Sequence, residues 1–233
     1  MLINFLFSII FFSGIILISI VFLPTLLLPQ RLVLIGGKLM GYWSSFCLKF
    51  ILSVDIKVLG KENIDPDRKF FIASSHQSMF ETFYLQTIFN SPVFILKKEL
   101  MFIPIFGWYL RKIGSVSIKR SKVTKDNLSF CDNIKKIINS SERPLVIFPQ
   151  GTRVRPEDRP SFKKGVSRIY EELKISCQPI AINSGYVWPK KGFKVPNKKI
   201  IISILPLISY GIEKNEFIKN LENQIYSELD KIN

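Results

Sequence analysis

Residues 70–82 read FFIASSHQSMFET, and residues 145–153 read LVIFPQGTR. Each stretch begins as a short apolar run and changes abruptly to polar residues, which is the pattern of a buried strand that ends in a loop. In the first stretch Glu81 follows Ser78 at the spacing of a capping box, so we expect a helix to begin at Ser78. A strand followed directly by a helix is the repeating unit of an α/β fold.

The same alternation continues through the rest of the chain. Expected strands lie at 54–58, 70–74, 93–97, 115–119, 145–148, 179–183 and 199–205, and expected helices lie at 78–89, 103–113, 124–139, 161–173 and 213–232. We therefore predict an α/β fold, a mixed sheet flanked by helices. Sites in such folds gather at the carboxyl ends of strands, so the polar residues after strands 70–74 and 145–148 are expected to meet in space.

The N-terminal region differs from this pattern. No charged residue occurs between Leu2 and Gln30, and a helix over residues 2–23 would be about 33 Å long, close to the hydrocarbon thickness of a bilayer. The start is not basic and no small-residue cleavage site follows, which argues against a cleaved signal peptide. We predict an N-terminal membrane-anchoring helical region at residues 1–52 and one α/β domain at residues 53–233.

A second apolar stretch, residues 32–52, contains Lys38 and Lys49. It suits a helix at the membrane interface with its lysines reaching the headgroups, and equally a helix packed on the globular domain. The first helix either spans the bilayer or forms a shallow hairpin with the second. Lysine and arginine are frequent after Arg31, which favours an α/β domain that faces the cytoplasm, and we expect an inner (plasma) membrane location.

The charge of the chain limits the classes of partner. It carries 33 Lys and Arg against 18 Asp and Glu, a net charge of +15, which suits nucleic acid, an anionic membrane or an acidic carrier protein. No nucleic-acid docking element is evident, so we expect no nucleic-acid partner. The three cysteines are widely spaced and the chain has a single histidine, so we expect neither a zinc site nor another metal site.

That histidine, His76, follows the strand at 70–74. A neutral imidazole can accept a proton from a hydroxyl near neutral pH, provided that an acceptor holds its other ring nitrogen. Glu81 can be that acceptor if His76 lies on the turn and Glu81 lies on the first helical turn. In the alternative interpretation Glu81 only caps the helix and His76 is an ordinary turn residue.

The segment after the strand at 145–148 predicts an anion site. Gly151 allows close approach of the backbone, Thr152 offers a hydroxyl, and Arg153 offers a guanidinium fork that matches phosphate. Lys97 and Arg120 follow two other predicted strands and would add positive charge at the same edge. The alternative is an ordinary turn that carries a solvated arginine.

These residues resemble the glycerolipid acyltransferase family, specifically the 1-acyl-sn-glycerol-3-phosphate acyltransferases. The family block N-H-x4-D matches residues 75–81, its second block matches 97–120, F-P-E-G-T-R matches 148–153, and the last block matches 178–185. The resemblance covers about residues 55–210. Two departures are Glu81, where the family has aspartate, and Gln150, where it has glutamate.

The resemblance implies acyl transfer from an acyl thioester, acyl-CoA or acyl carrier protein, to the free hydroxyl of a membrane lysophosphatidic acid, giving phosphatidic acid without a further cofactor. It implies that His76, oriented by Glu81, is the general base. It also implies that Arg120, Gly151, Thr152 and Arg153 bind the substrate phosphate, with Lys97 and Gln150 in support. The alternatives are an acyltransferase for another lysolipid and a non-catalytic lipid-binding membrane protein.

Overall fold

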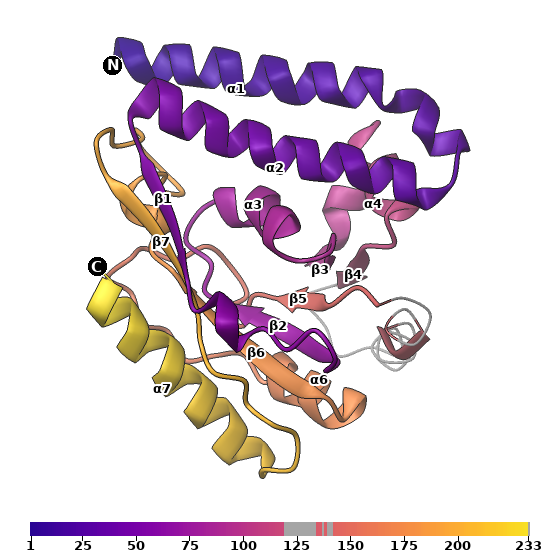
Figure 1. Cartoon of the computed structure of the whole chain (residues 1–233), viewed down its shortest axis with the longest axis vertical. Coiled ribbons are helices and arrows are strands. Elements are labelled where there is room, and N and C mark those ends of the chain that lie inside the picture. Colours follow the sequence, from indigo (N-terminus) through magenta and orange to yellow (C-terminus); the bar gives the residue numbers. More distant parts are fainter. Residues whose placement is uncertain (119–133, 137, 139–141, 233) are drawn as a thin grey trace.

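The computed structural model describes residues 1–118, 134–136, 138 and 142–232. Within them, one seven-stranded sheet has the strand order β1-β7-β6-β2-β5-β3-β4 (Figure 1). The strands are β1 (Asp55–Leu59), β2 (Phe70–Ser74), β3 (Val93–Lys97), β4 (Val116–Ile118), β5 (Leu145–Ile147), β6 (Ser176–Ile182) and β7 (Lys199–Ile204). The helices are α1 (Leu2–Val21), α2 (Gln30–Leu52), α3 (Phe80–Ile88), α4 (Phe106–Lys112), α6 (Gly165–Leu173) and α7 (Lys214–Ile232). The prediction of an α/β fold with a mixed sheet is confirmed.

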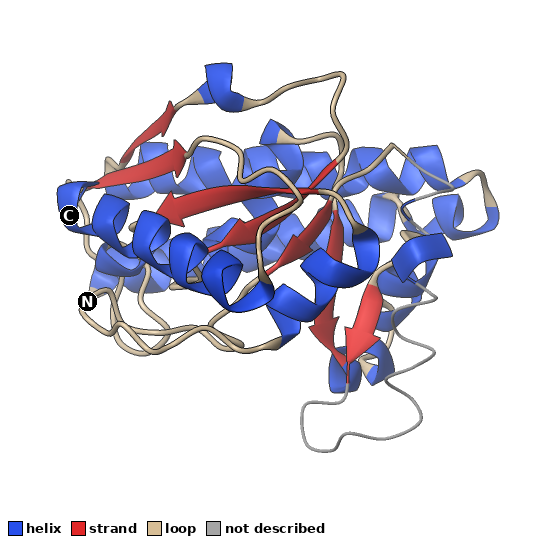
Figure 2. Cartoon of the chain, turned by 90° about the horizontal axis from the view of Figure 1, so that it is seen from below, coloured by secondary structure: helices blue, strands red, loops and turns tan. Residues whose placement is uncertain are grey.

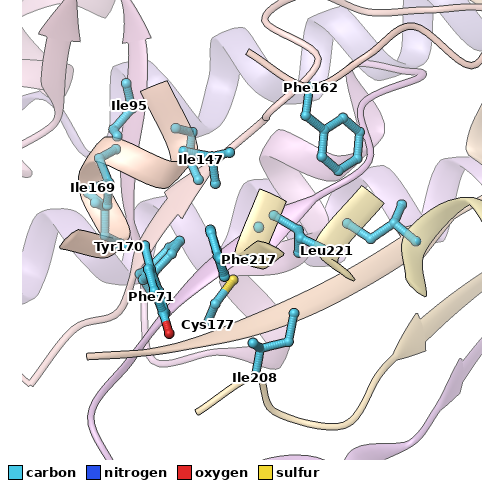
Figure 3. Packing of buried hydrophobic residues seen from close by; sticks show 14 of the residues in the cluster. Phe71, Ile95, Ile147, Phe162, Ile169, Tyr170, Cys177, Ile208, Phe217 and Leu221 are labelled. Atoms are coloured by element: carbon cyan, nitrogen blue, oxygen red, sulfur yellow. The ribbon is translucent and has the colours of Figure 1, made fainter. Parts of the chain in front are cut away.

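Strand β2 is central in the sheet and buried on both faces. Side chains alternate along a strand, so Phe71 and Ala73 face one side while Ile72 faces the other. On the first side they meet α6 and α7 in a core that includes Tyr170 and Phe217, whose rings stack 3.9 Å apart (Figure 3). The sheet therefore lies between two helical layers, α6 and α7 on one face and the N-terminal helices with α3 on the other (Figure 2).

The direction of the strands changes once across the sheet. Strands β6, β2, β5, β3 and β4 are parallel to one another, whereas β6 and β7 are antiparallel and β1 is parallel to β7. An antiparallel pair needs no helical crossover, and the connection from β6 to β7 contains only the short 3-10 turn Ser184–Tyr186. The five parallel strands consequently end at the same edge, where the predicted site residues lie.

The two N-terminal helices form an antiparallel pair stacked on the domain (Figure 1). Helix α2 packs directly on α3, and Gly41 is required there, because a Cβ atom at this position would lie 2.6 Å from the carbonyl oxygen of Phe83. The stretch at 32–52 is thus a helix packed on the domain. Helix α1 buries Phe7 and Phe11, and among the described helices it alone is long and apolar enough to cross a membrane.

Three helices begin two or more residues later than predicted. Helix α3 begins at Phe80 because the hydroxyl of Ser78 accepts a hydrogen bond from the Phe80 N–H, which places the serine before the helix. Helix α4 begins at Phe106, after Pro104 and after Ile105, whose φ of 62° is not helical. Helix α6 begins at Gly165, because the N–H groups of Phe162 and Lys163 bond to Glu222 and Pro149. Most of the predicted helix at 124–139 lies outside the described residues.

Candidate active site

His76 lies two residues beyond the end of β2, the strand that pairs with β5 on one side and with β6 on the other. Ala73 of β2 pairs with Ile147 of β5, and His76 and Gln150 lie equally far along the chain beyond that pair. The His76 N–H donates to Oε1 of Gln150 at 2.7 Å, and the His76 carbonyl accepts from the N–H of Val154 at 2.9 Å. The two sequence motifs are therefore joined by hydrogen bonds on both sides of the histidine.

The Glu81 carboxylate is fully buried beneath this turn. Its Oε1 atom accepts hydrogen bonds from the N–H groups of Gln77 (2.7 Å) and Ser78 (2.9 Å), so the carboxylate does cap the turn. The same oxygen lies 3.8 Å from Nδ1 of His76. Neither Nδ1 nor Oε2 has a hydrogen-bond partner among the described residues. Such contacts are often long in a ligand-free site and tighten when substrate binds, so the geometry suits an orienting carboxylate as well.

Phe148 holds the imidazole ring from one face. The two rings stack with centroids 4.0 Å apart and an angle of 17° between their planes. The side chain of His76 is 14% exposed, so it is not sealed from solvent, although Nδ1 itself is buried. A ring fixed in this way needs little reorganisation before it accepts a proton. The sequence contains Phe148 within a motif, but nothing in the motif indicates that it stacks on the histidine.

Polar side chains next to His76 tie the turn to β6. The Ser75 hydroxyl accepts from the Ile182 N–H at 2.8 Å, and the Gln77 side-chain carbonyl accepts from the Gly185 N–H at 3.0 Å. Both serve as positioning residues that the sequence reasoning missed. Their only signal was a run of polar residues directly after a buried strand.

Gln150 is one of the two positions at which the sequence departs from the family pattern. Its oxygen accepts the His76 N–H, a bond that a glutamate could accept equally well. The Gln150 side chain is buried, and it also interacts with the hydroxyl of Tyr226. The positioning of the histidine backbone therefore survives the loss of charge at this position.

The segment after β5 makes the turn that the glycine predicted. Gly151 has a φ of 75°, and its N–H donates to the Phe148 carbonyl at 2.9 Å. A side chain at this left-handed position would be strained. The Thr152 hydroxyl accepts a hydrogen bond from Nζ of Lys190 at 3.1 Å. The same ammonium donates to the backbone carbonyl of Arg153 at 3.3 Å, and Arg153 is half-buried.

The other predicted basic residues are less closely associated. Lys97 ends β3 at the same edge of the sheet, but its ammonium lies 3.3 Å from Oε1 of Glu99 and its side chain is half exposed. Arg120 lies outside the described residues. The site that the structure brings together thus consists of His76, Glu81, Gln150 and the 151–153 turn.

Comparisons with known proteins identify the family of the chain. A family model described as Acyltransferase matches residues 55–183. The chain is 31% identical over 160 residues to a 1-acyl-sn-glycerol-3-phosphate acyltransferase of Pseudomonas aeruginosa, a match that covers 65% of this chain and 59% of that protein. It is 29% identical over 215 residues to the protein of the same name from Saccharomyces cerevisiae, covering 85% of this chain and 69% of the relative.

The fold also matches a solved structure. The crystal structure of the 1-acyl-sn-glycerophosphate (LPA) acyltransferase of Thermotoga maritima superposes with a TM-score of 0.79 at 20% identity, covering 99% of this chain and 95% of that one. The likeness extends over the N-terminal helices as well as the sheet. The family model covers more than half of the sequence and includes both motifs. The resemblance is confirmed, and the chain belongs to the acyltransferase family.

Proposed function

We propose that this protein transfers an acyl group from an acyl thioester to the free hydroxyl of 1-acyl-glycerol-3-phosphate, giving phosphatidic acid. One observation carries the proposal: hydrogen bonds on both sides of His76 hold the histidine against the segment that carries Gly151, Thr152 and Arg153. A base and an anion-binding turn are thereby fixed next to each other. This is what acylation of a hydroxyl on a phosphate-bearing acceptor requires.

The reaction needs one base and one direct transfer. Nε2 of His76 takes the proton of the acceptor hydroxyl, while Nδ1–H is held by the carboxylate of Glu81. The acceptor oxygen then bonds to the thioester carbonyl carbon, and the carbon–sulfur bond breaks. The thiolate leaves, and the imidazolium returns the proton to it. Arg153 and Thr152 hold the phosphate during these steps. Arg120 and Lys97 are proposed to support it, and acyl-CoA or acyl carrier protein serves as the donor.

We further propose that the protein acts at a membrane surface, on the cytoplasmic side of the inner membrane. Exposed apolar side chains cover the outer side of α1 and continue near α4: Leu2, Phe5, Leu6, Ile9, Phe12, Ile16, Leu17, Ile20, Phe102, Phe106 and Trp108. Hydrogen bonds join helix α1 to the domain near both of its ends. The Asn4 side chain donates to the Lys194 carbonyl, and the Tyr109 hydroxyl donates to the Ser19 carbonyl. A helix held in this way favours insertion into one leaflet over a full crossing.

The experiment uses purified full-length protein in mixed micelles. Lysophosphatidic acid is offered with acyl-CoA or with acyl carrier protein, and phosphatidic acid is measured, with His76→Ala as the inactive control. We expect the native chain to form phosphatidic acid from one or both donors, and the His76→Ala control to form none. Transfer to lysophosphatidylcholine in place of lysophosphatidic acid would overturn the proposed acceptor. No transfer to any lysolipid would favour a non-catalytic lipid-binding protein.

A further inference from the structure

The loop between β6 and β7 approaches the anion-binding turn, although nothing in the sequence motifs connects them. Nζ of Lys190 donates to the Thr152 hydroxyl oxygen at 3.1 Å and to the Arg153 carbonyl at 3.3 Å. An ammonium group has three N–H donors, and the third one of Lys190 makes no hydrogen bond within the described residues. This donor remains available to a ligand at the turn.

The charges around this turn are unbalanced. No ion pair joins Lys190 or Arg153 to a carboxylate in the described part of the chain. Because the Thr152 oxygen accepts from the ammonium, its own hydroxyl proton points elsewhere and can be donated. The turn therefore carries the Lys190 ammonium and the Thr152 hydroxyl, with Arg153 in the same segment, and donors of this kind suit a phosphate dianion.

The loop that carries Lys190 is held firmly from the other side by the first helix. The ring of Trp188 contacts the rings of Phe7 and Phe11 edge-on, with centroids 5.2 and 5.0 Å apart. Asn4 bonds to both backbone groups of Lys194, accepting from its N–H at 2.6 Å and donating to its carbonyl at 3.0 Å. The base of the loop is closed by a hydrogen bond from the Val195 N–H to the Val187 carbonyl.

We propose that Lys190 is a phosphate-binding residue of the acceptor site, held over Thr152 and Arg153 by a loop that α1 clamps. This inference rests on the proposed function, because it assigns a further group to the same phosphate. It predicts that Lys190 contributes to binding of the lysophosphatidic acid headgroup, not to the proton transfer. The membrane-facing helix and the phosphate site are then mechanically connected through Trp188 and Lys194.

The test compares Lys190→Ala, Lys190→Arg and the neighbouring exposed control Lys191→Ala in the full chain. We expect Lys190→Ala to raise KM for lysophosphatidic acid about tenfold, because one charge-assisted hydrogen bond to the phosphate is lost. Both kcat and the KM for the acyl donor should stay unchanged. Lys190→Arg should restore much of the affinity, and Lys191→Ala should behave as the native chain. An unchanged acceptor KM, or a rise only in the donor KM, would overturn the assignment.

The clamp is tested by a double-mutant cycle. Asn4→Ala removes both hydrogen bonds to the Lys194 backbone, so we expect it to raise the acceptor KM by less than Lys190→Ala does. In a protein that already carries Lys190→Ala, adding Asn4→Ala should cause no further rise. Fully additive effects would refute the connection through the loop. Native activity on lysophosphatidic acid tests the proposed function by itself, so its failure is separate from a failure of either variant to change KM.

Discussion

The Glu81→Gln substitution separates the two roles that the structure gives this carboxylate. Oε1 of Glu81 accepts two backbone N–H groups, from Gln77 and Ser78, and also lies 3.8 Å from Nδ1 of His76. Glutamine keeps an acceptor oxygen and nearly the same shape but removes the charge. Hydrogen bonds to a charged acceptor exceed neutral ones by about 1 kcal/mol each, so we expect folding to lose about 2 kcal/mol and the melting temperature to fall by about 4–8 °C.

The effect on catalysis should be larger. Two unit charges about 4 Å apart at an effective dielectric constant of about 20 attract by about 4 kcal/mol, which is an upper bound for the stabilisation of an imidazolium by Glu81. Since the imidazole is only partly charged in the transition state, we expect kcat to fall about 10²- to 10³-fold. Glu81→Asp keeps the charge on a shorter side chain and should retain part of the activity.

The assay is steady-state formation of phosphatidic acid, with thermal unfolding measured on the same preparations. Glu216→Gln is the matched control, because Glu216 is an exposed glutamate in the first turn of α7. It should leave kcat unchanged and lower the free energy of unfolding by less than about 1 kcal/mol, the usual contribution of a carboxylate in a first helical turn. If Glu81→Gln lowers the melting temperature but keeps kcat within about threefold of the native value, Glu81 only caps the turn and the orienting role is wrong.

Three further outcomes are expected. His76→Ala should lower kcat roughly 10²- to 10⁴-fold through loss of the general base, while circular dichroism shows a folded protein; near-native turnover would exclude His76 as the base. Arg153→Lys should raise KM for lysophosphatidic acid about tenfold in steady-state assays, because a point charge does not replace a bidentate fork; an unchanged KM would assign the phosphate to other cations. Deletion of residues 1–30 should make flotation on anionic vesicles salt-sensitive and lower the melting temperature, because it uncovers Trp188; equally tight flotation in high salt would show that α1 is not the anchor.

The elements of the fold were predictable because they depend on local features of the sequence. The strand at Phe70–Ser74 is an apolar run of ordinary length, and the capping glutamate three residues after Ser78 marks the start of the next helix. The turn at Gly151 likewise needs only local chemistry, because glycine adopts its positive φ without strain. The start of α6 was wrong because a backbone N–H has a distant partner there, Phe162 bonding to Glu222, whereas the starts of α3 and α4 were shifted by local features, the Ser78 hydroxyl and the positive φ of Ile105.

The candidate site was predictable only in part. The sequence by itself determined that His76, Glu81 and the 151–153 turn follow strands, because apolar periodicity and turn chemistry act over a few residues. Only the tertiary structure decided that Gln150 holds the His76 backbone, that Phe148 stacks on its ring, and that Lys190 reaches Thr152. These contacts depend on strand order, on the Ala73–Ile147 register and on the docking of α1 against the loop after β6. Each of them joins residues far apart in the chain, whose meeting is set by packing of the whole domain and not by any local pattern.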